Sequence, residues 1–158
     1  MVNFSKQTTI IQNRKAFHNY EMLFEIEAGV QLLGPEVKSL RARRVSIEQG
    51  FIKIEGGEVF LCGVRISPYE NTTYFDCDPV RKRKLLLKKM QINDLAKKVD
   101  EKGYTIIPLK IYIKNGLVKV LIAAAKGKTK ADKRETLKKK IVQREIDREH
   151  KVDNRKYI

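Results

Sequence analysis

Apolar and polar residues alternate most regularly in YTIIPLKIYIK and LVKVLIAAA, two runs that flank Asn115-Gly116. Alternation with a period of two is typical of a strand with one buried face. Asn-Gly is the preferred pair for a type I′ hairpin turn. We therefore predict a β-hairpin over residues 104–125. Proline cannot donate a hydrogen bond to a strand ladder, so Pro108 predicts a bulge or a sheet edge within this hairpin.

A second hairpin is predicted over residues 51–66, with its turn at Gly56-Gly57. Residues 20–32, YEMLFEIEAGVQL, alternate well enough for a further strand, and Gly29 predicts a bend in it. Five or six short antiparallel strands close most simply into a barrel, which leaves no exposed sheet edge.

Two helices are predicted between the strands. The first begins at Gly34-Pro35, since proline is favoured in the first turn, and it turns Val37 and Leu40 inward and Lys38, Arg41 and Arg44 outward. The second runs from about Gln91 to a stop at Gly103, with Ile92, Leu95 and Val99 at inward spacing. The predicted fold class is mainly β: a small closed antiparallel barrel of the oligonucleotide-binding type, with about three accessory helices and a basic C-terminal tail.

Charge divides the 158 residues into a barrel core, residues 1–125, and a tail, residues 126–158. The formal net charge is +15, and the tail alone carries 13 basic and 6 acidic side chains. Its few apolar residues cannot bury enough surface to fold alone.

In the tail, Asp132 with Glu135 predicts a capped helix start. Lys133, Lys140, Arg144, Arg148, Lys151 and Arg155 would form one cationic stripe on that helix. We predict a tail that is disordered when free and helical when a polyanion neutralises the stripe.

Catalytic and metal-binding patterns are missing from the sequence. The only histidines, His18 and His150, lie at the two ends, and the GKT at residues 127–129 lacks the P-loop glycine, because position 122 is Ile122. Asp76 and Asp78 favour a capped turn over a metal pair. Cys62 and Cys77 have no CxxC spacing and are expected to be reduced thiols. The sequence predicts no enzyme, no metal and no cofactor.

The strong positive charge points to a polyanionic partner. No run approaches 18 apolar residues, the N-terminus lacks the layout of a signal peptide, and no amphipathic helix shows exposed Trp or Phe. RNA is therefore favoured over a membrane, and a cytoplasmic location is expected. No helix-turn-helix or zinc-finger signature indicates DNA. Four basic clusters supply the charge: residues 13–15, residues 38–44, residues 81–89 and the tail.

Several motifs resemble the small protein B family, whose members are also called SsrA-binding proteins. They are GPEVKSLR (34–41), SPY (67–69), DPVRKRKLLL (78–87), PLKIYIKNGLVKV (108–120) and AKGKTKADKRETLKK (125–139). The resemblance runs from about Ile11 to the end of the tail. Pro35 departs from a common threonine, and Arg43-Arg44 from a common Gly-Lys.

The resemblance implies a bacterial, non-catalytic adapter for trans-translation. Its barrel would grip the tRNA-like domain of transfer-messenger RNA (tmRNA), and the complex would enter stalled ribosomes and allow tagging of the nascent chain. The tail would become helical in the empty mRNA path, against ribosomal RNA around the decoding site. A monomer is expected. A constitutive ribosomal protein or translation factor, and a basic nuclease, remain alternatives from composition alone.

Candidate site residues follow from the clusters and from the resemblance. The RNA-facing candidates on the barrel are Asn13, Lys15, His18, Glu27, Lys38, Arg41, Arg81, Arg83, Lys84, Leu86 and Lys88. A carboxylate such as Glu27 can accept hydrogen bonds from base amino groups or a 2′-hydroxyl, whereas Leu86 would pack on an unstacked base or fill core. The ribosome-contacting candidates in the tail are Lys126, Lys128, Lys133, Arg134, Lys138, Lys140, Arg144 and Arg148.

Overall fold

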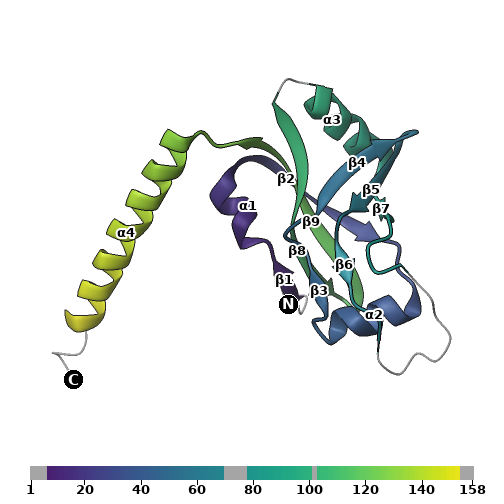
Figure 1. Ribbon diagram of the computed structural model, residues 1–158, viewed down its shortest axis with the longest axis horizontal. Helices are drawn as coiled ribbons and strands as arrows, with labels where there is room; N and C mark the ends of the chain where they lie inside the picture. The colour runs from purple at the N-terminus through teal and green to yellow at the C-terminus, as the bar shows by residue number, and fades with distance from the viewer. Residues whose placement is uncertain (1–6, 70–77, 101–102, 154–158) are drawn as a thin grey trace, which may run out of the picture. The chain divides into compact units, whose positions relative to one another are not determined.

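The computed structural model of the chain describes residues 7–69, 78–100 and 103–153. The chain divides into two compact units, unit 1 (residues 1–127) and unit 2 (residues 128–158). The helices of unit 1 are α1 (Arg14–Asn19), α2 (Gly34–Arg41) and α3 (Lys89–Asp100) (Figure 1). Its strands are β1 (Gln7–Gln12), β2 (Tyr20–Val30), β3 (Val45–Ser46), β4 (Phe51–Glu55), β5 (Glu58–Cys62), β6 (Arg65–Ile66), β7 (Arg83–Leu86), β8 (Tyr104–Lys114) and β9 (Leu117–Gly127).

Seven of these strands form one antiparallel sheet in the order β1-β8-β9-β2-β7-β5-β4, and β3 pairs with β6 separately. The fold is therefore mainly β, as predicted. The predicted closed barrel is not found, because the ladder of described residues does not return from β4 to β1. Instead, β4 packs against β8 without joining it in a ladder.

The hairpin predicted over residues 104–125 is confirmed, and the second is confirmed over residues 51–62. Its predicted end at residue 66 is wrong, because Arg65–Ile66 forms β6, which pairs with β3. Strands β4 and β5 pair on either side of the turn at Gly56-Gly57. Strands β8 and β9 pair from Lys114↔Leu117, next to their turn, to Tyr104↔Lys126. Asn115 and Gly116 have φ angles of 51° and 78°, the left-handed pair that a type I′ turn needs. The predicted bulge is also confirmed, since the β8–β9 register shifts between Pro108 and Lys110.

Strand β2 pairs with β9 on one side and β7 on the other, and β2 and β7 together join the two hairpins into one sheet. Its register with β9 shifts between Met22 and Phe24. The bend predicted at Gly29 stays a prediction; Gly29 itself pairs with Lys119 of β9 and with Leu86 of β7. Beyond the shift, Ile26 and Ala28 point into the core and Glu25 and Glu27 point out. This alternation fixes which β2 side chains reach the outer face of the sheet.

The helices follow the predicted pattern with one correction. In α2, Leu40 is 1 % exposed while Lys38 and Arg41 lie on the surface. In α3, Leu95 is buried, but the predicted inward position of Val99 is wrong, because Val99 is 42 % exposed. Residue 99 lies in the last turn of α3, which the core no longer covers.

Two apolar clusters fill unit 1. The larger lies inside the curved sheet and contains Ile26, Leu61, Leu95, Ile111 and Ile122 among others. The smaller lies on the outer face, where α1 places Ala16 over the alanines of β9. Helix α1 therefore covers one end of the outer face, and the Glu27 end of β2 remains exposed.

Unit 2 contains helix α4 (Lys130–Asp153). Its cap differs from the predicted one: Thr129 is the capping residue and Asp132 stands three positions later. The Asp132 N–H donates to Thr129 Oγ1 at 3.2 Å, and the Thr129 N–H donates to Asp132 Oδ2 at 3.0 Å. These reciprocal bonds satisfy N–H groups that a helix start leaves unpaired. The Thr129 hydroxyl also donates to Asp132 Oδ2 at 2.6 Å, and this bond, followed by the bond from the Thr129 N–H, lowers the pKa of Asp132. Glu135 instead pairs with Lys139 at 2.8 Å.

Candidate nucleic-acid interface

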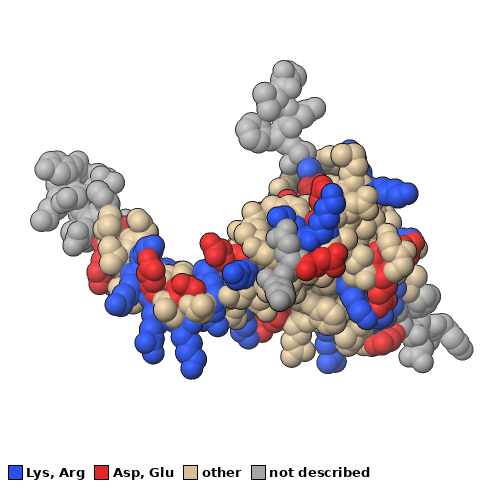
Figure 2. Space-filling view, turned by 90° about the horizontal axis from the view of Figure 1, so that it is seen from above, with Lys and Arg blue, Asp and Glu red and all other residues tan. Residues whose placement is uncertain are grey.

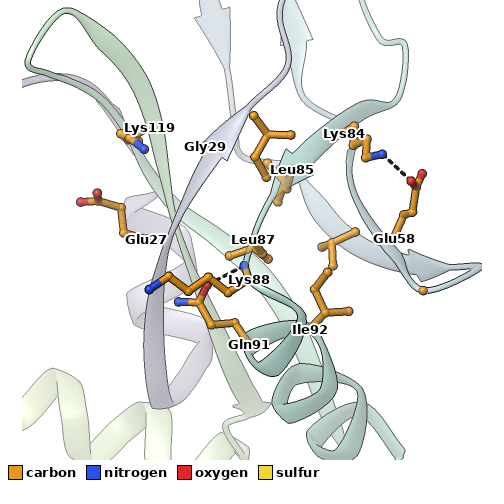
Figure 3. Close-up of a pocket in the computed structure, with 13 residues that line it drawn as sticks. Glu27, Gly29, Glu58, Lys84, Leu85, Leu87, Lys88, Gln91, Ile92 and Lys119 are labelled. Carbon is orange, nitrogen blue, oxygen red and sulfur yellow. Dashed lines mark hydrogen bonds and ion pairs between the residues drawn. The ribbon is translucent and has the colours of Figure 1, made fainter.

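A hollow of about 600 Å³ opens where β2, β5, β7 and the start of α3 meet (Figure 3). Its walls are mixed: an apolar floor, one amide, and several charged side chains at the rim. The lining residues are Glu27, Gly29, Gly57, Glu58, Val59, Lys84, Leu85, Leu86, Leu87, Lys88, Gln91, Ile92 and Lys119. In Figure 3, Glu27 and Lys119 lie on one side of β2, and the Lys84–Glu58 ion pair lies on the other.

Glu27 is held by two side chains of β8, which reach it across β9. The Tyr112 hydroxyl donates to Glu27 Oε2 at 2.5 Å, and Lys114 Nζ lies 3.0 Å from the same oxygen. The bond from Tyr112 and then the bond from Lys114 lower the pKa of Glu27 below its ordinary value of 4.5. Glu27 is therefore an ionised acceptor, with part of its charge offset by Lys114 and with Lys119 nearby.

Leu86 presents an apolar side chain at the centre of this surface, and 56 % of it is exposed. It pairs with Gly29 of β2, and a Cβ on residue 29 would stand only 3.2 Å from Leu86 Cβ. A second, more apolar hollow of about 250 Å³ lies next to the first and shares Gly29, Leu86 and Lys119 with it. Leu86 is therefore not the core residue that its apolar character alone suggests.

The basic wall of the hollow comes from β7 and from the short segment between β7 and α3. Lys84 pairs with Glu58 of β5, and the exposed Lys88 lies just before α3. The Lys88 N–H donates to Gln91 Oε1 at 3.0 Å, a bond that caps the start of α3. Lys88 and Gln91 line the same hollow as Leu86.

Arg83 has a different role from the predicted one. It is 0 % exposed, and its guanidinium donates to Glu36 Oε1 at 2.9 Å and to the carbonyls of Val64 and Pro79. The prediction that Arg83 faces RNA is therefore wrong, because no part of this side chain reaches the surface. Arg81 also donates to Glu36, at 2.6 Å, and is partly exposed.

Burial by itself would raise the pKa of Glu36, but the Arg81 and Leu33 hydrogen bonds and the Arg83 charge outweigh it and lower the pKa. The ionised carboxylate joins α2 to the strand that carries Leu86.

Asn13 is also structural. It is 4 % exposed, its Oδ1 accepts from Ala16 N–H at 3.1 Å, and its Nδ2 donates to the Pro108 carbonyl at 3.3 Å. The amide therefore caps α1 and ties it to β8, and little of it is exposed; its predicted contact with RNA stays a prediction. Lys15 and His18, by contrast, are exposed on α1, with Lys15 paired to Glu48 at 2.5 Å.

The remaining barrel candidates lie on different parts of the surface of unit 1. Glu27, Lys84, Leu86 and Lys88 meet at the hollow. Lys38 and Arg41 lie on the exposed side of α2, where Lys38 Nζ stands 5.7 Å from the centre of the Tyr69 ring. Lys15, His18 and Arg81 lie elsewhere on unit 1, outside the lining of the hollow.

The tail candidates divide at the boundary between the units. Lys126 belongs to β9, where it pairs with Glu21 and Tyr104, and not to the tail helix. Lys128 donates to Thr136 Oγ1 at 3.4 Å. Figure 2 shows Lys and Arg side chains projecting along α4 with acidic ones between them. The exposed candidates on α4 are Arg134, Lys138, Lys140, Arg144 and Arg148, and Lys133 is half-buried. Arg155 of the predicted stripe lies outside the described residues.

Sequence reasoning missed Tyr112, Lys114, Lys119 and Gln91. A signal for three of them was present, because Lys110, Tyr112 and Lys114 alternate along β8, and Lys119 stands opposite Tyr112 on β9. Period-two alternation puts all four of these β8 and β9 side chains on the outer face. The sequence contained no signal that Glu27 stands beside them.

The remaining predictions concern the aspartates, the cysteines, metal binding and membrane helices. Asp78 caps a turn, as its Oδ1 accepts from the Val80 N–H at 2.9 Å. Asp76 and Cys77 lie outside the described residues, and Cys62 is a buried free thiol. Within the described ranges, no group of three or more His, Cys, Asp or Glu side chains could hold a metal ion. In the same ranges, no helix has the length and apolar character that crossing a membrane requires.

Together, the fold and its surface define a small β-sheet protein with a charged hollow and a separate basic helix, features typical of a protein that binds a polyanion. Residues 10–152 match the family model of the SmpB protein, and the chain belongs to that family.

Curated relatives and a solved structure agree with this assignment. The SsrA-binding protein of Enterococcus faecalis is 51 % identical over 146 residues, 92 % of this chain and 95 % of the relative. The SsrA-binding protein of Clostridium novyi is 47 % identical, over 92 % of this chain and 93 % of that one. A solved chain from "tmRNA-SmpB: a journey to the center of the bacterial ribosome" is similar with a TM-score of 0.65 and 46 % identity. The similarity covers 80 % of this chain and 93 % of the solved one.

Proposed function

We propose that this chain is a tmRNA-binding adapter for trans-translation and not an enzyme. Unit 1 binds the tRNA-like domain of tmRNA, and the complex enters stalled ribosomes, rescues them and allows the nascent chain to be tagged. The observation that carries the proposal is the 46 % identity to a solved SmpB chain that is described together with tmRNA and the bacterial ribosome. The relatives named as SsrA-binding proteins support the same ligand.

The geometry of the hollow supports an RNA ligand through three kinds of contact. Lys88 and Lys119 supply positive charge for phosphates, whose neutralisation releases counterions. Leu86 supplies an apolar surface for an unstacked base, and Glu27 supplies an ionised acceptor for a base N–H or a 2′-hydroxyl. An acceptor beside lysines suits structured RNA with unpaired nucleotides better than a uniform duplex backbone.

For unit 2 we propose that α4 is largely unfolded in the free protein and becomes helical in the empty mRNA path of the ribosome. Its apolar side chains Leu137, Ile141 and Ile146 are 41–51 % exposed and too few to dock it firmly. Ribosomal RNA would neutralise its lysines and arginines and offset the entropy of ordering the segment.

Two finer expectations complete the proposal. The sheet is a variant of the oligonucleotide-binding barrel in which β4 packs on β8 without closing the ladder. The protein acts in the cytoplasm, since the bacterial ribosome named with the solved relative lies there. We expect it to be a monomer.

Sequencing the RNA that co-purifies with the tagged protein from bacterial cells tests the proposal. One small stable RNA, tmRNA, should be enriched over ribosomal RNA and lost at high salt. A fixed amount of protein in every ribosomal subunit, without tmRNA enrichment, would instead indicate a constitutive ribosomal protein. Cleavage of RNA in magnesium by the purified chain would indicate a nuclease.

A further inference from the structure

Tyr112 is an unusual residue for an outward-facing position of a sheet. Tyr112 is 2 % exposed. Its partners on the two neighbouring strands are more accessible: Lys119 of β9 is half-buried, and Thr9 of β1 is exposed. Lys110 Nζ stands 5.0 Å from the centre of its ring. Close packing on all sides holds the ring in place. In this position its hydroxyl donates a hydrogen bond to Glu27 Oε2.

The two oxygens of Glu27 are used unequally. Oε2 receives the Tyr112 hydroxyl at 2.5 Å and Lys114 Nζ at 3.0 Å. Among the described residues, the one hydrogen bond to Oε1 comes from Lys114 at the longer distance of 3.4 Å. A carboxylate has about four acceptor positions in total, so most of the capacity of Oε1 remains for a ligand in the hollow that Glu27 lines.

A carboxylate on an RNA-binding surface repels phosphates unless its charge is offset. It accepts a hydrogen bond from one particular RNA group only if its direction is also fixed. Lys114 offsets the charge, but an ammonium on a flexible stem fixes direction poorly. The neutral hydroxyl of a buried tyrosine fixes direction well, because the ring cannot turn without leaving its packed position.

We propose that Tyr112 is a positioning residue for RNA recognition, which holds Glu27 so that Oε1 accepts a hydrogen bond from an unpaired nucleotide, through a base N–H or a 2′-hydroxyl. The inference rests on the proposed function, because it concerns the same RNA surface. In this view Tyr112 strengthens RNA binding by orienting Glu27 and does not itself touch the RNA.

The test compares Tyr112→Phe, Glu27→Gln and the double variant in binding to the tRNA-like domain of tmRNA at several salt concentrations. Tyr112→Phe should weaken binding by roughly five- to thirtyfold, the effect of misplacing one charged hydrogen bond. The slope of log K against log salt should stay unchanged, since no cation is removed. The double variant should bind no more weakly than Glu27→Gln alone. Tyr104→Phe, on the same strand and opposite Lys126, is the matched control and should bind normally.

Glu27→Asp supplies a second test that leaves Tyr112 in place. The shorter side chain stays ionised but cannot reach the hydroxyl, so positioning predicts a loss of affinity similar to that of Glu27→Gln. Normal binding by Tyr112→Phe or by Glu27→Asp would overturn the inference while leaving the proposed function standing, and so would additive losses in the double variant. Failure of the unmodified protein to bind this RNA would overturn both.

Discussion

Glu36 and Arg83 form an ion pair inside unit 1, with Arg83 Nε 2.9 Å from Glu36 Oε1 and both side chains at most 6 % exposed. The two residues stand 47 positions apart, one on α2 and one on β7. Arg83 donates its remaining hydrogen bonds to backbone carbonyls, which compensates part of the cost of burying its charge. The pair therefore fixes the helix that carries Lys38 and Arg41 against the strand that carries Leu86.

Removing the charge of Glu36 should destabilise the fold. Glu36→Gln leaves the Arg83 guanidinium buried without its counter-charge, and breaking such a pair costs about 3–5 kcal/mol. Urea unfolding followed by circular dichroism measures this loss. Glu48→Gln, which removes the exposed partner of Lys15, is the control and should cost less than about 1 kcal/mol. Equal, small losses in both variants would contradict a structural role for Glu36.

The same carboxylate should make the stability of the fold depend on pH. The pKa of Glu36 is lowered in the folded state, so its contribution is present above the ordinary value of 4.5 and is lost as the pH falls through the folded pKa. The stability difference between the unmodified protein and Glu36→Gln should therefore shrink as the pH falls below 4.5. Denaturant titrations at neutral pH and at successively lower pH values measure it. A difference that stays constant would mean that folding does not lower the pKa of Glu36.

Leu86→Ala should weaken RNA binding without unfolding the protein. The side chain is 56 % exposed, so its removal should change stability by only a few tenths of a kcal/mol. Burying a fully exposed leucine side chain is worth about 1.5–3 kcal/mol, and 56 % of this one is exposed, so the variant should bind the tRNA-like RNA about fivefold or more weakly. Met90→Ala, 78 % exposed and outside the hollow, is the control. Equal affinities for the two variants would remove Leu86 from the interface.

Lys88→Ala should reduce the salt dependence of RNA binding. Removing one lysine–phosphate interaction lowers the magnitude of the slope of log K against log salt by about 0.7–0.9. Filter binding or fluorescence anisotropy over a series of salt concentrations gives this slope. Lys97→Ala changes an exposed lysine of α3 that does not line the hollow, and its slope should match that of the unmodified protein. An unchanged slope for Lys88→Ala would show that Lys88 does not bind a phosphate.

Truncation after Lys130 should separate the two activities proposed for the chain. Unit 1 keeps the complete hollow, so binding to the isolated tRNA-like RNA should remain nearly intact. Tagging on stalled ribosomes should be abolished, because α4 begins at Lys130 and is removed. Both activities are measured with the same truncated protein beside the full chain. Surviving tagging would mean that the basic tail is only a solvated end of the chain.

Local chemistry in the sequence was enough to predict the hairpins and the start of α2. The turns at Asn115-Gly116 and Gly56-Gly57 depend on residues that accept positive φ angles, and the helix at Gly34-Pro35 depends on a proline in its first turn. The bulge at Pro108 follows from a missing N–H. Each of these features is decided by neighbours in sequence, so it was predictable before any long-range pairing was known.

The candidate site was predicted only in part. The resemblance and the charge clusters named Glu27, Lys84, Leu86 and Lys88, which line one hollow. Whether a charged residue faces water or protein depends on strands far away in sequence. Arg83 is buried because Glu36, 47 residues earlier, compensates its charge.

The sequence by itself determined the alternation, the turns and the excess of positive charge, because these depend on residue type and spacing. Only the tertiary structure decided that Asn13 turns inward, that the β2 irregularity falls between Met22 and Phe24, and that Tyr112 meets Glu27 across 85 residues. The physical reason is that a ladder register sets which distant side chains share a face, and a shift of one residue would turn each of them to the other side.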